Sequence, residues 1–178
     1  MSRTNPFKKK RRQANKTILI FGEGLDEKIF IKHLKGLYSH NKNISIKIWG
    51  GKGGGPEDIV LDAYRTLGAF DKRVVILDNE KSMPEMTKAR IKAKQLGIDI
   101  IENTPCLESL FLKILGKKVN NSKPSQLKKE FELVHLPEKR RRNVSEYKKI
   151  FPKKLLDSKR SQIPELDKLI SVMEGLNI

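Results

Sequence analysis

The chain has 178 residues, 37% of them hydrophobic, and its 38 Lys and Arg against 21 Asp and Glu give a net charge of +17. This length and apolar content are typical of one domain with short appendages, and a second full domain is not expected. No apolar run approaches the roughly 18 residues of a membrane span. The single cysteine, Cys106, excludes an internal disulfide and a multi-cysteine zinc site. We therefore expect a cytoplasmic protein with neither anchor nor signal peptide, whose positive charge suits a nucleic-acid partner.

Residues 1–16 are predicted to form a basic tail. Residues 3–16 contain several Lys and Arg and no acidic side chain. Such a run is either a solvated tail or a segment that contacts phosphates, and the sequence leaves both interpretations open.

Residues 17–116 alternate between strand and helix patterns, which predicts an α/β core. Short apolar or alternating segments predict four strands, at residues 17–21, 44–48, 73–77 and 98–101. Apolar residues at helical spacing predict four helices, at residues 26–38, 56–67, 84–96 and 107–115. This order favours a parallel sheet of about four strands with helices on both faces, and places functional groups at the carboxyl ends of the strands.

Beyond Gly116 the pattern changes, and we predict a basic helical extension over residues 117–178. Its amphipathic helices are expected near residues 125–134, 144–156 and 163–173. Within it, residues 139–160 form a second Lys- and Arg-rich run in which Tyr147 and Phe151 are interleaved. These two rings are expected to stack either on nucleic-acid bases or on the core.

Four carboxylates follow the first and third predicted strands. Glu23 comes directly after the first strand, between two glycines, and Glu27 lies one helical turn further on. Asp78 and Glu80 come directly after the third strand. Each residue alone is explained by a turn or a helix N-terminus. If the two strands are neighbours, however, all four meet at one sheet edge, where they repel unless a cation or a proton holds them together.

Magnesium is the cation expected at this edge, because a hard cation prefers carboxylate and phosphate oxygens. The histidines lack zinc-ligand spacing. Paired ions stabilise the attacking and leaving oxygens in phosphodiester cleavage. Lys81 would neutralise charge there, unless it is a solvated surface lysine. Glu108 opens the last core helix, where it either joins the site or stabilises the helix dipole.

The glycine-rich segment 49–58, "WGGKGGGPED", resembles a phosphate loop only superficially. It lacks the Lys-Ser/Thr pair that opens the helix in ATP-binding loops, which argues against ATP. It is either a flexible connection or a cradle in which free amides and Lys52 hold a nucleic-acid phosphate. Trp49, the only tryptophan, is expected in the core.

Three motifs follow one another along the chain. An Ile-Leu-Ile strand runs into Glu-Gly-x-x-Glu, a later strand ends in Asp-Asn-Glu, and "NTPCLESLFLKIL" follows. Together they resemble the RloB-like branch of the TOPRIM proteins, related to the nuclease domains of OLD-family proteins, over about residues 17–116. The resemblance implies a TOPRIM-like fold, a role in phage defence, and Mg²⁺ or Mn²⁺ at an acidic site. The implied metal positions are Glu23, Glu27, Asp78, Glu80 and Glu108.

We therefore predict a metal-dependent nuclease acting on DNA or RNA. Its predicted catalytic residues are Glu23, Asp78, Glu80 and Lys81. The alternative is a non-catalytic protein that binds nucleic acid or a partner and keeps a degenerate TOPRIM site. Its support is the Asp-Asn-Glu order, where Asp-x-Asp is commoner in the family. A TOPRIM ribonuclease that matures ribosomal RNA is a third interpretation, although its characteristic Asp-Pro-Asp-like element is not evident.

Basic side chains of the two charged runs and of the glycine-rich loop are expected to contact the nucleic-acid backbone without regard to sequence. They are Lys8, Lys9, Lys10, Arg11, Arg12, Lys52, Arg140, Arg141, Arg142, Lys148 and Lys149. A small basic nuclease would endanger its host unless it were restrained. A regulatory ATPase or self-association is therefore a further expectation, and a membrane partner is not expected.

Overall fold

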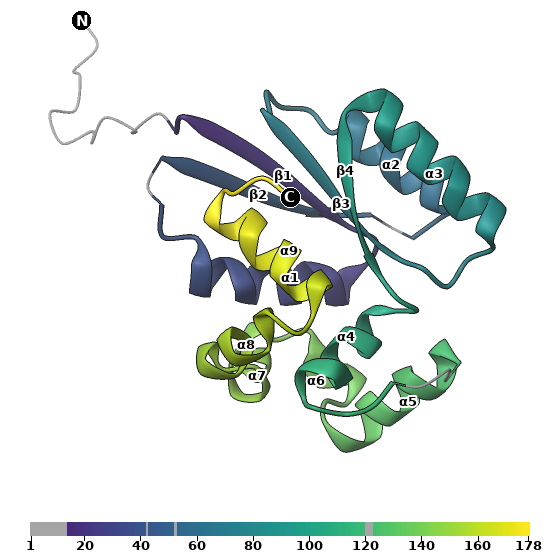
Figure 1. The fold of residues 1–178 in the computed structure, drawn as a ribbon, viewed down its shortest axis with the longest axis vertical. Helices are drawn as coiled ribbons and strands as arrows, with labels where there is room; N and C mark the ends of the chain where they lie inside the picture. Colours follow the sequence, from purple (N-terminus) through teal and green to yellow (C-terminus); the bar gives the residue numbers. More distant parts are fainter. Residues whose placement is uncertain (1–13, 42, 52, 120–122) are drawn as a thin grey trace, which may run out of the picture.

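A computed structural model of the chain describes residues 14–41, 43–51, 53–119 and 123–178. The predicted phosphate contacts Lys8, Lys9, Lys10, Arg11, Arg12 and Lys52 lie outside these ranges. Four strands form one parallel sheet in the order β2-β1-β3-β4 (Figure 1). Their bounds are β1 Lys16–Gly22, β2 Ile44–Gly50, β3 Lys72–Asp78 and β4 Ile98–Asn103. The parallel sheet is confirmed, and so is the pairing of the first and third strands.

Helices cover both faces of this sheet, as predicted. The core helices are α1 Leu25–Tyr38, α2 Pro56–Arg65, α3 Met83–Leu96 and α4 Leu107–Ile114. Helices α2 and α3 pack against β3 and β4 on one face, while α1 packs against β1 and β2 on the other (Figure 1). The α/β fold with three layers is therefore the one that the alternating pattern favours.

The two central strands, β1 and β3, consist largely of continuous apolar residues. The side chains of Ile18 and Ile20 belong to a large cluster with α1 and α4, whereas Phe21 belongs to a smaller cluster with α2 and α3. Successive side chains of a strand point to opposite faces, so a strand buried on both faces needs apolar residues at every position. The predicted burial of Cys106 is confirmed as well.

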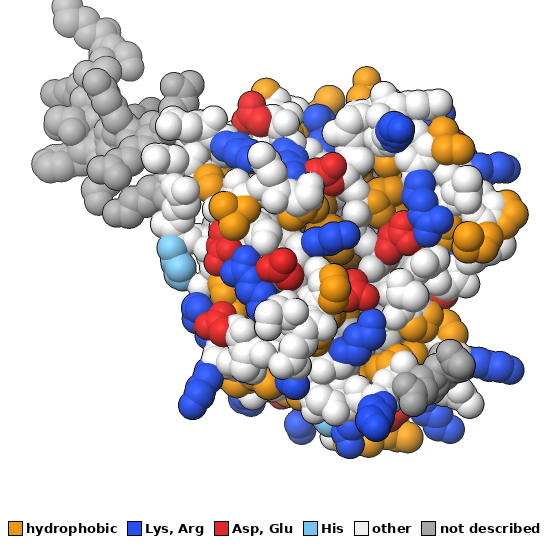
Figure 2. All heavy atoms as spheres, viewed as in Figure 1, with side chains coloured by type: hydrophobic (Ala, Val, Ile, Leu, Met, Phe, Trp, Pro, Cys, Tyr) orange, Lys and Arg blue, Asp and Glu red, His pale blue; other side chains and the backbone are white. Residues whose placement is uncertain are grey.

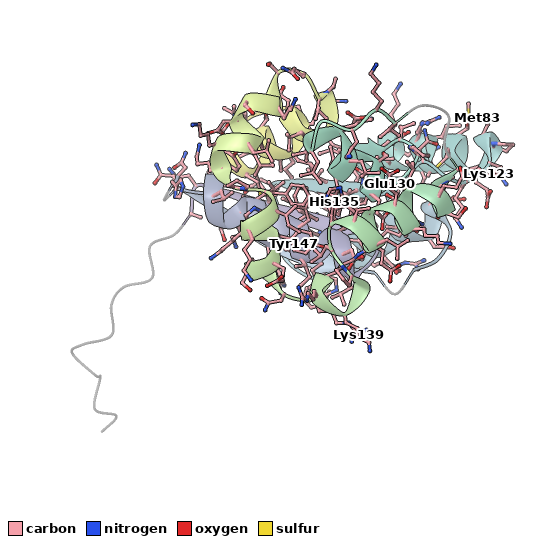
Figure 3. The ribbon with its side chains drawn as sticks, turned by 90° about the horizontal axis from the view of Figure 1, so that it is seen from below. Met83, Lys123, Glu130, His135, Lys139 and Tyr147 are labelled. Atoms are coloured by element: carbon pink, nitrogen blue, oxygen red, sulfur yellow. The ribbon has the colours of Figure 1, made fainter. Side chains whose placement is uncertain are left out.

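The C-terminal helices share the core of the sheet. Their bounds are α5 Pro124–Val134, α6 Glu138–Arg141, α7 Val144–Ile150, α8 Lys153–Arg160 and α9 Pro164–Glu174. The ring of Phe111 in α4 lies 4.9 Å from Phe131, 5.1 Å from Phe151 and 5.8 Å from Tyr147, centroid to centroid. Figure 3 shows these helices from below, with Tyr147 among them. Tyr147 and Phe151 are therefore core residues, and the boundary at residue 117 stays a prediction.

Several expectations need correction. The helix predicted at residues 144–156 is two helices, α7 and α8, because Pro152 stands between them and proline ends a helix. The helix expected over 56–67 ends at Arg65, and Leu67 is exposed. Trp49, expected in the core, is 47% exposed, because α2 and α3 pack over β3 and β4 and not over β2. Within the described ranges no helix has both the length and the apolar content to span a bilayer.

Candidate functional site

The carboxyl ends of β1 and β3 lie side by side and bring the predicted carboxylates together. Gly22 at the end of β1 pairs with Ile76 of β3, so Glu23 emerges next to Asp78. The backbone N–H of Asp78 donates a hydrogen bond to Oε2 of Glu23 over 3.4 Å. The convergence at one sheet edge follows from the strand order and from the position of each carboxylate at a strand end.

An open pocket of about 570 Å³ lies at this edge, and we call it the carboxylate pocket. All five predicted metal positions line it: Glu23, Glu27, Asp78, Glu80 and Glu108. The other lining residues are Gly24, Leu25, Asp26, Gly51, Gly53, Lys128 and Arg142. Carboxylates from three separate segments of the chain therefore face one cavity, together with two basic side chains and the glycine-rich loop.

Glu27 is held against the end of β1 by the small size of Gly22. A Cβ atom at Gly22 would lie 2.8 Å from the Cβ of Glu27, so a larger residue would push the glutamate away. The carboxylate of Glu27 also accepts a hydrogen bond from the backbone N–H of Gly24 over 2.9 Å, which caps α1. Burial, assisted by the negative charge of Glu23, raises the pKa of Glu27 to about 7. Gly22 thus serves the placement of this glutamate.

Asp78 is the most perturbed carboxylate of the pocket. Its residue is 8% exposed, and Asn103 at the end of β4 donates a hydrogen bond from Nδ2 to its Oδ1 over 3.3 Å. Burial in the first place, and then the negative charge of Glu27, raise the pKa of Asp78 to about 8. The Oδ1 atom of Asn103 is buried and has no hydrogen-bond partner among the described residues. A carboxylate in this position favours a proton or a cation beside it.

Two basic side chains from the C-terminal helices pair with the outer carboxylates. Lys128 of α5 lies 3.0 Å from Oε2 of Glu80. Arg141 of α6 lies 2.9 Å from Oε1 of Glu108 and 3.2 Å from Oδ2 of Asp26. Burial opposes the charge of both cations, but these hydrogen bonds and the surrounding carboxylates outweigh it and raise both pKa values. Glu80 and Glu108 are therefore already partly neutralised by the protein.

Of the predicted phosphate-contacting side chains in the C-terminal helices, one is buried and the others are exposed. Arg141 was expected to contact phosphate, but it is only 6% exposed and its guanidinium is engaged by two carboxylates, so this expectation is wrong. Arg142, its neighbour, is exposed and lines the carboxylate pocket. Arg140, Lys148 and Lys149 are exposed. Figure 2 shows Lys and Arg spread over the lower part of the molecule, where the C-terminal helices lie.

Lys81, the predicted catalytic lysine, is exposed and is not part of the lining of the carboxylate pocket. Lys128, from helix α5, lies in that lining instead. No sequence signal pointed to Lys128, because it lies far along the chain on a helix whose packing decides its direction. Asn103 was also missed, although its place at the carboxyl end of the fourth strand was a usable signal.

The donor atoms of the pocket suit a hard divalent cation, since they are carboxylate oxygens beside an amide. Burial in the first place, and neighbouring carboxylates after it, raise the pKa values of Glu27 and Asp78, so the charged form of each is costly, and a bound cation would lower that cost. As the side chains stand, however, no three Asp, Glu, His or Cys residues in the described parts of the chain are grouped closely enough to hold a metal ion. Cation binding would therefore require the carboxylates to draw together.

Comparison of the chain with protein-family models, with curated proteins and with solved structures found no match in any of the three. The residues of the site combine buried carboxylates at a parallel sheet edge, exposed basic side chains and a glycine-rich loop.

Proposed function

We propose that this protein is a cytoplasmic, metal-dependent nuclease of the RloB-like TOPRIM type, acting in phage defence. The observation that carries the proposal is the meeting of six carboxylates, the five predicted metal positions and Asp26, from three chain segments in one pocket. Burying like charges together opposes folding, and such an arrangement suits the binding of a cation. The net charge of +17 over the whole chain supports a polyanionic substrate.

The chain's own residues suit the parts of a phosphodiester hydrolysis. Asp78, Glu27 and Glu23 would hold Mg²⁺ or Mn²⁺, which when bound polarises the phosphate and activates water. Lys128 and the exposed Arg142 lie on the same lining and would neutralise phosphate oxygens. At neutral pH the carboxyl groups of Asp78 and Glu27 are largely or partly protonated, and those protons must leave when a cation arrives.

The proposal is tested by incubating the purified chain with DNA and with structured RNA, each with Mg²⁺, with Mn²⁺ and with a chelator. We expect cleavage of at least one substrate that depends on the metal and is lost in Glu23→Gln. Glu132→Gln removes the same charge from an exposed position on α5 and is the matched control. Cleavage by Glu23→Gln at the rate of the unmodified chain would contradict the assignment.

A second candidate function is a non-catalytic protein that binds nucleic acid or a partner. It is favoured by the ion pairs of Glu80 with Lys128 and of Glu108 with Arg141, which leave fewer free ligands for a metal. Calorimetric titration with Mg²⁺ and Mn²⁺ separates the two candidates. Saturable binding that is lost in Asp78→Asn supports the nuclease, and the absence of heat at every tested concentration supports the binding protein.

A further inference from the structure

Trp49 is a large aromatic residue that the fold leaves half exposed. It lies on β2, an edge strand of the sheet that the described residues form, and it pairs in register with Phe21 of β1. The two side chains therefore point to the same face. Phe21 is 3% exposed because α2 and α3 cover it, but that cover does not extend over β2, and Trp49 stays 47% exposed.

Two lysine side chains lie over this half-exposed indole. Nζ of Lys47 lies 5.0 Å from the ring centroid of Trp49, and Nζ of Lys28 lies 6.0 Å from it. A groove of about 570 Å³ runs along the ring, and we call it the Trp49 groove. Its lining includes Lys47, Trp49, Arg65 and Leu67, with Asp62 as the one acidic residue in that lining. Single-stranded nucleic acid stacks its bases on exposed aromatic rings beside cations, and a base stacked on Trp49 would take the place of a lysine head group that now lies over the ring.

The Trp49 groove adjoins the carboxylate pocket. Gly51 lines both cavities, and its backbone N–H donates a hydrogen bond to the carbonyl oxygen of Gly22 over 2.9 Å. This bond fixes the start of the glycine-rich loop beside Glu23. A Cβ atom at Gly51 would lie only 3.2 Å from the carbonyl oxygen of Glu23. Because glycine has no Cβ atom, the loop can pass this close to Glu23, and the two cavities stay adjacent. The two cavities therefore adjoin at Gly51.

We propose that Trp49 stacks an unpaired base of a single-stranded nucleic acid whose backbone continues into the carboxylate pocket. Lys47 and Lys28 neutralise the phosphates on either side of the stacked base. The inference rests on the proposed function, because it names the substrate class of the same site. A duplex keeps its bases stacked on one another and offers no free face to the indole, so single strands are the preferred ligand.

Tryptophan fluorescence tests the proposal directly, because Trp49 is the only tryptophan in the chain and its emission reports this groove alone. The chain is titrated in chelator with single-stranded DNA, with single-stranded RNA and with a blunt duplex of the same sequence. We expect saturable quenching by at least one of the single strands and much weaker quenching by the duplex. Unchanged emission at saturation, or equal quenching by the duplex, would overturn the proposal.

Variants give a second test through the anisotropy of a labelled single strand. Trp49→Ala is expected to weaken binding by about tenfold or more, the level at which stacking of one base contributes. Trp49→Phe keeps a ring and is expected to retain most of the affinity. Tyr64→Ala, which removes an exposed ring of α2 outside the groove lining, is the control and is expected to bind normally. Equal affinity of Trp49→Ala and the unmodified chain would overturn the proposal.

These measurements separate the stacking proposal from the nuclease proposal, because binding is measured without metal. Quenching by single strands together with no cleavage under any metal would support the stacking site and contradict the nuclease. Metal-dependent cleavage without any change in Trp49 emission would support the nuclease and contradict the stacking site.

Discussion

The carboxylate pocket and the Trp49 groove meet at Gly51, and they depart from ordinary folding in opposite ways. The pocket buries the carboxyl groups of Asp78 and Glu27 although their charges repel. The groove exposes an indole that burial would stabilise. Buried charge and exposed large aromatic surface both oppose stability. Other large apolar side chains, such as Leu133, are exposed as well. The carboxylate pocket and the Trp49 groove differ from these in adjoining one another, and this is where function is expected.

Asp78→Asn should have the largest effect and should move activity and stability in opposite directions. Loss of the carboxylate is expected to lower cleavage by at least about a hundredfold, because a cation ligand is lost. The raised pKa means that folding is penalised as pH rises from the unfolded value toward about 8, and Asn removes that penalty. Thermal unfolding at about pH 8 should therefore show a stability gain of about 1 kcal/mol or more. A variant that loses both activity and stability would show that Asp78 is structural.

Replacing the buried Arg141 by alanine should destabilise the protein far more than replacing an exposed arginine. Removing the guanidinium leaves Glu108 buried without a partner, which is expected to lower the free energy of unfolding by about 3 kcal/mol. Arg142→Ala, one residue on, is the matched control because its side chain is exposed. It should change stability by less than about 0.5 kcal/mol while weakening nucleic-acid binding. Denaturant unfolding and anisotropy measure the two effects, and equal destabilisation by both variants would contradict this division.

The two cavities should also respond differently to pH. Protons compete with a cation for Asp78 and Glu27, so the affinity for Mn²⁺ is expected to rise by about tenfold or more from about pH 6 to about pH 9. Lys128 and Arg141, which face the same carboxylates, have raised pKa values and stay charged over this range. The indole does not titrate, so quenching of Trp49 in chelator should change little. Cation affinity that is flat over the same range would contradict the raised pKa values.

The smallest expected effect is the difference in cleavage rate between Lys128→Gln and Lys81→Gln. Lys128 lines the carboxylate pocket and pairs with Glu80, whereas Lys81 is exposed outside it. We expect Lys128→Gln to lower cleavage by about tenfold and Lys81→Gln to leave it within about twofold. Steady-state cleavage rates of the two variants provide the measurement. The reverse order would restore Lys81 to the role that the sequence first assigned to it.

Much of the fold followed from local patterns. The continuous apolar runs of β1 and β3 predicted buried parallel strands, and the carboxylates after them predicted a shared sheet edge. These inferences succeeded because strand length, apolar content and position after a strand are all local properties. The break at Pro152 was equally local, and the proline was a sufficient reason to end the helix there.

The burial and the partners of individual side chains depended on how the helices pack, and a short sequence segment does not determine this packing. Arg141 and Arg142 stand side by side in one charged run, yet the direction of α6 buries the first and exposes the second. Trp49 has the composition of a core residue, and only the placement of α2 and α3 away from β2 leaves it exposed. The pairing of Lys128 with Glu80 likewise joins residues that are distant in the sequence.

Because the chain is synthesised from its N-terminus, the contact of Arg141 with Asp26 and Glu108 determines when the carboxylate pocket can form during synthesis. Every carboxylate of the pocket is made before residue 141, which supplies the counter-charge of Glu108. A nascent or truncated chain that stops short of that residue would hold an uncompensated anion in an apolar setting. Such a chain is expected to leave the pocket unformed, so that the proposed nuclease would acquire its activity only after the C-terminal helices have folded.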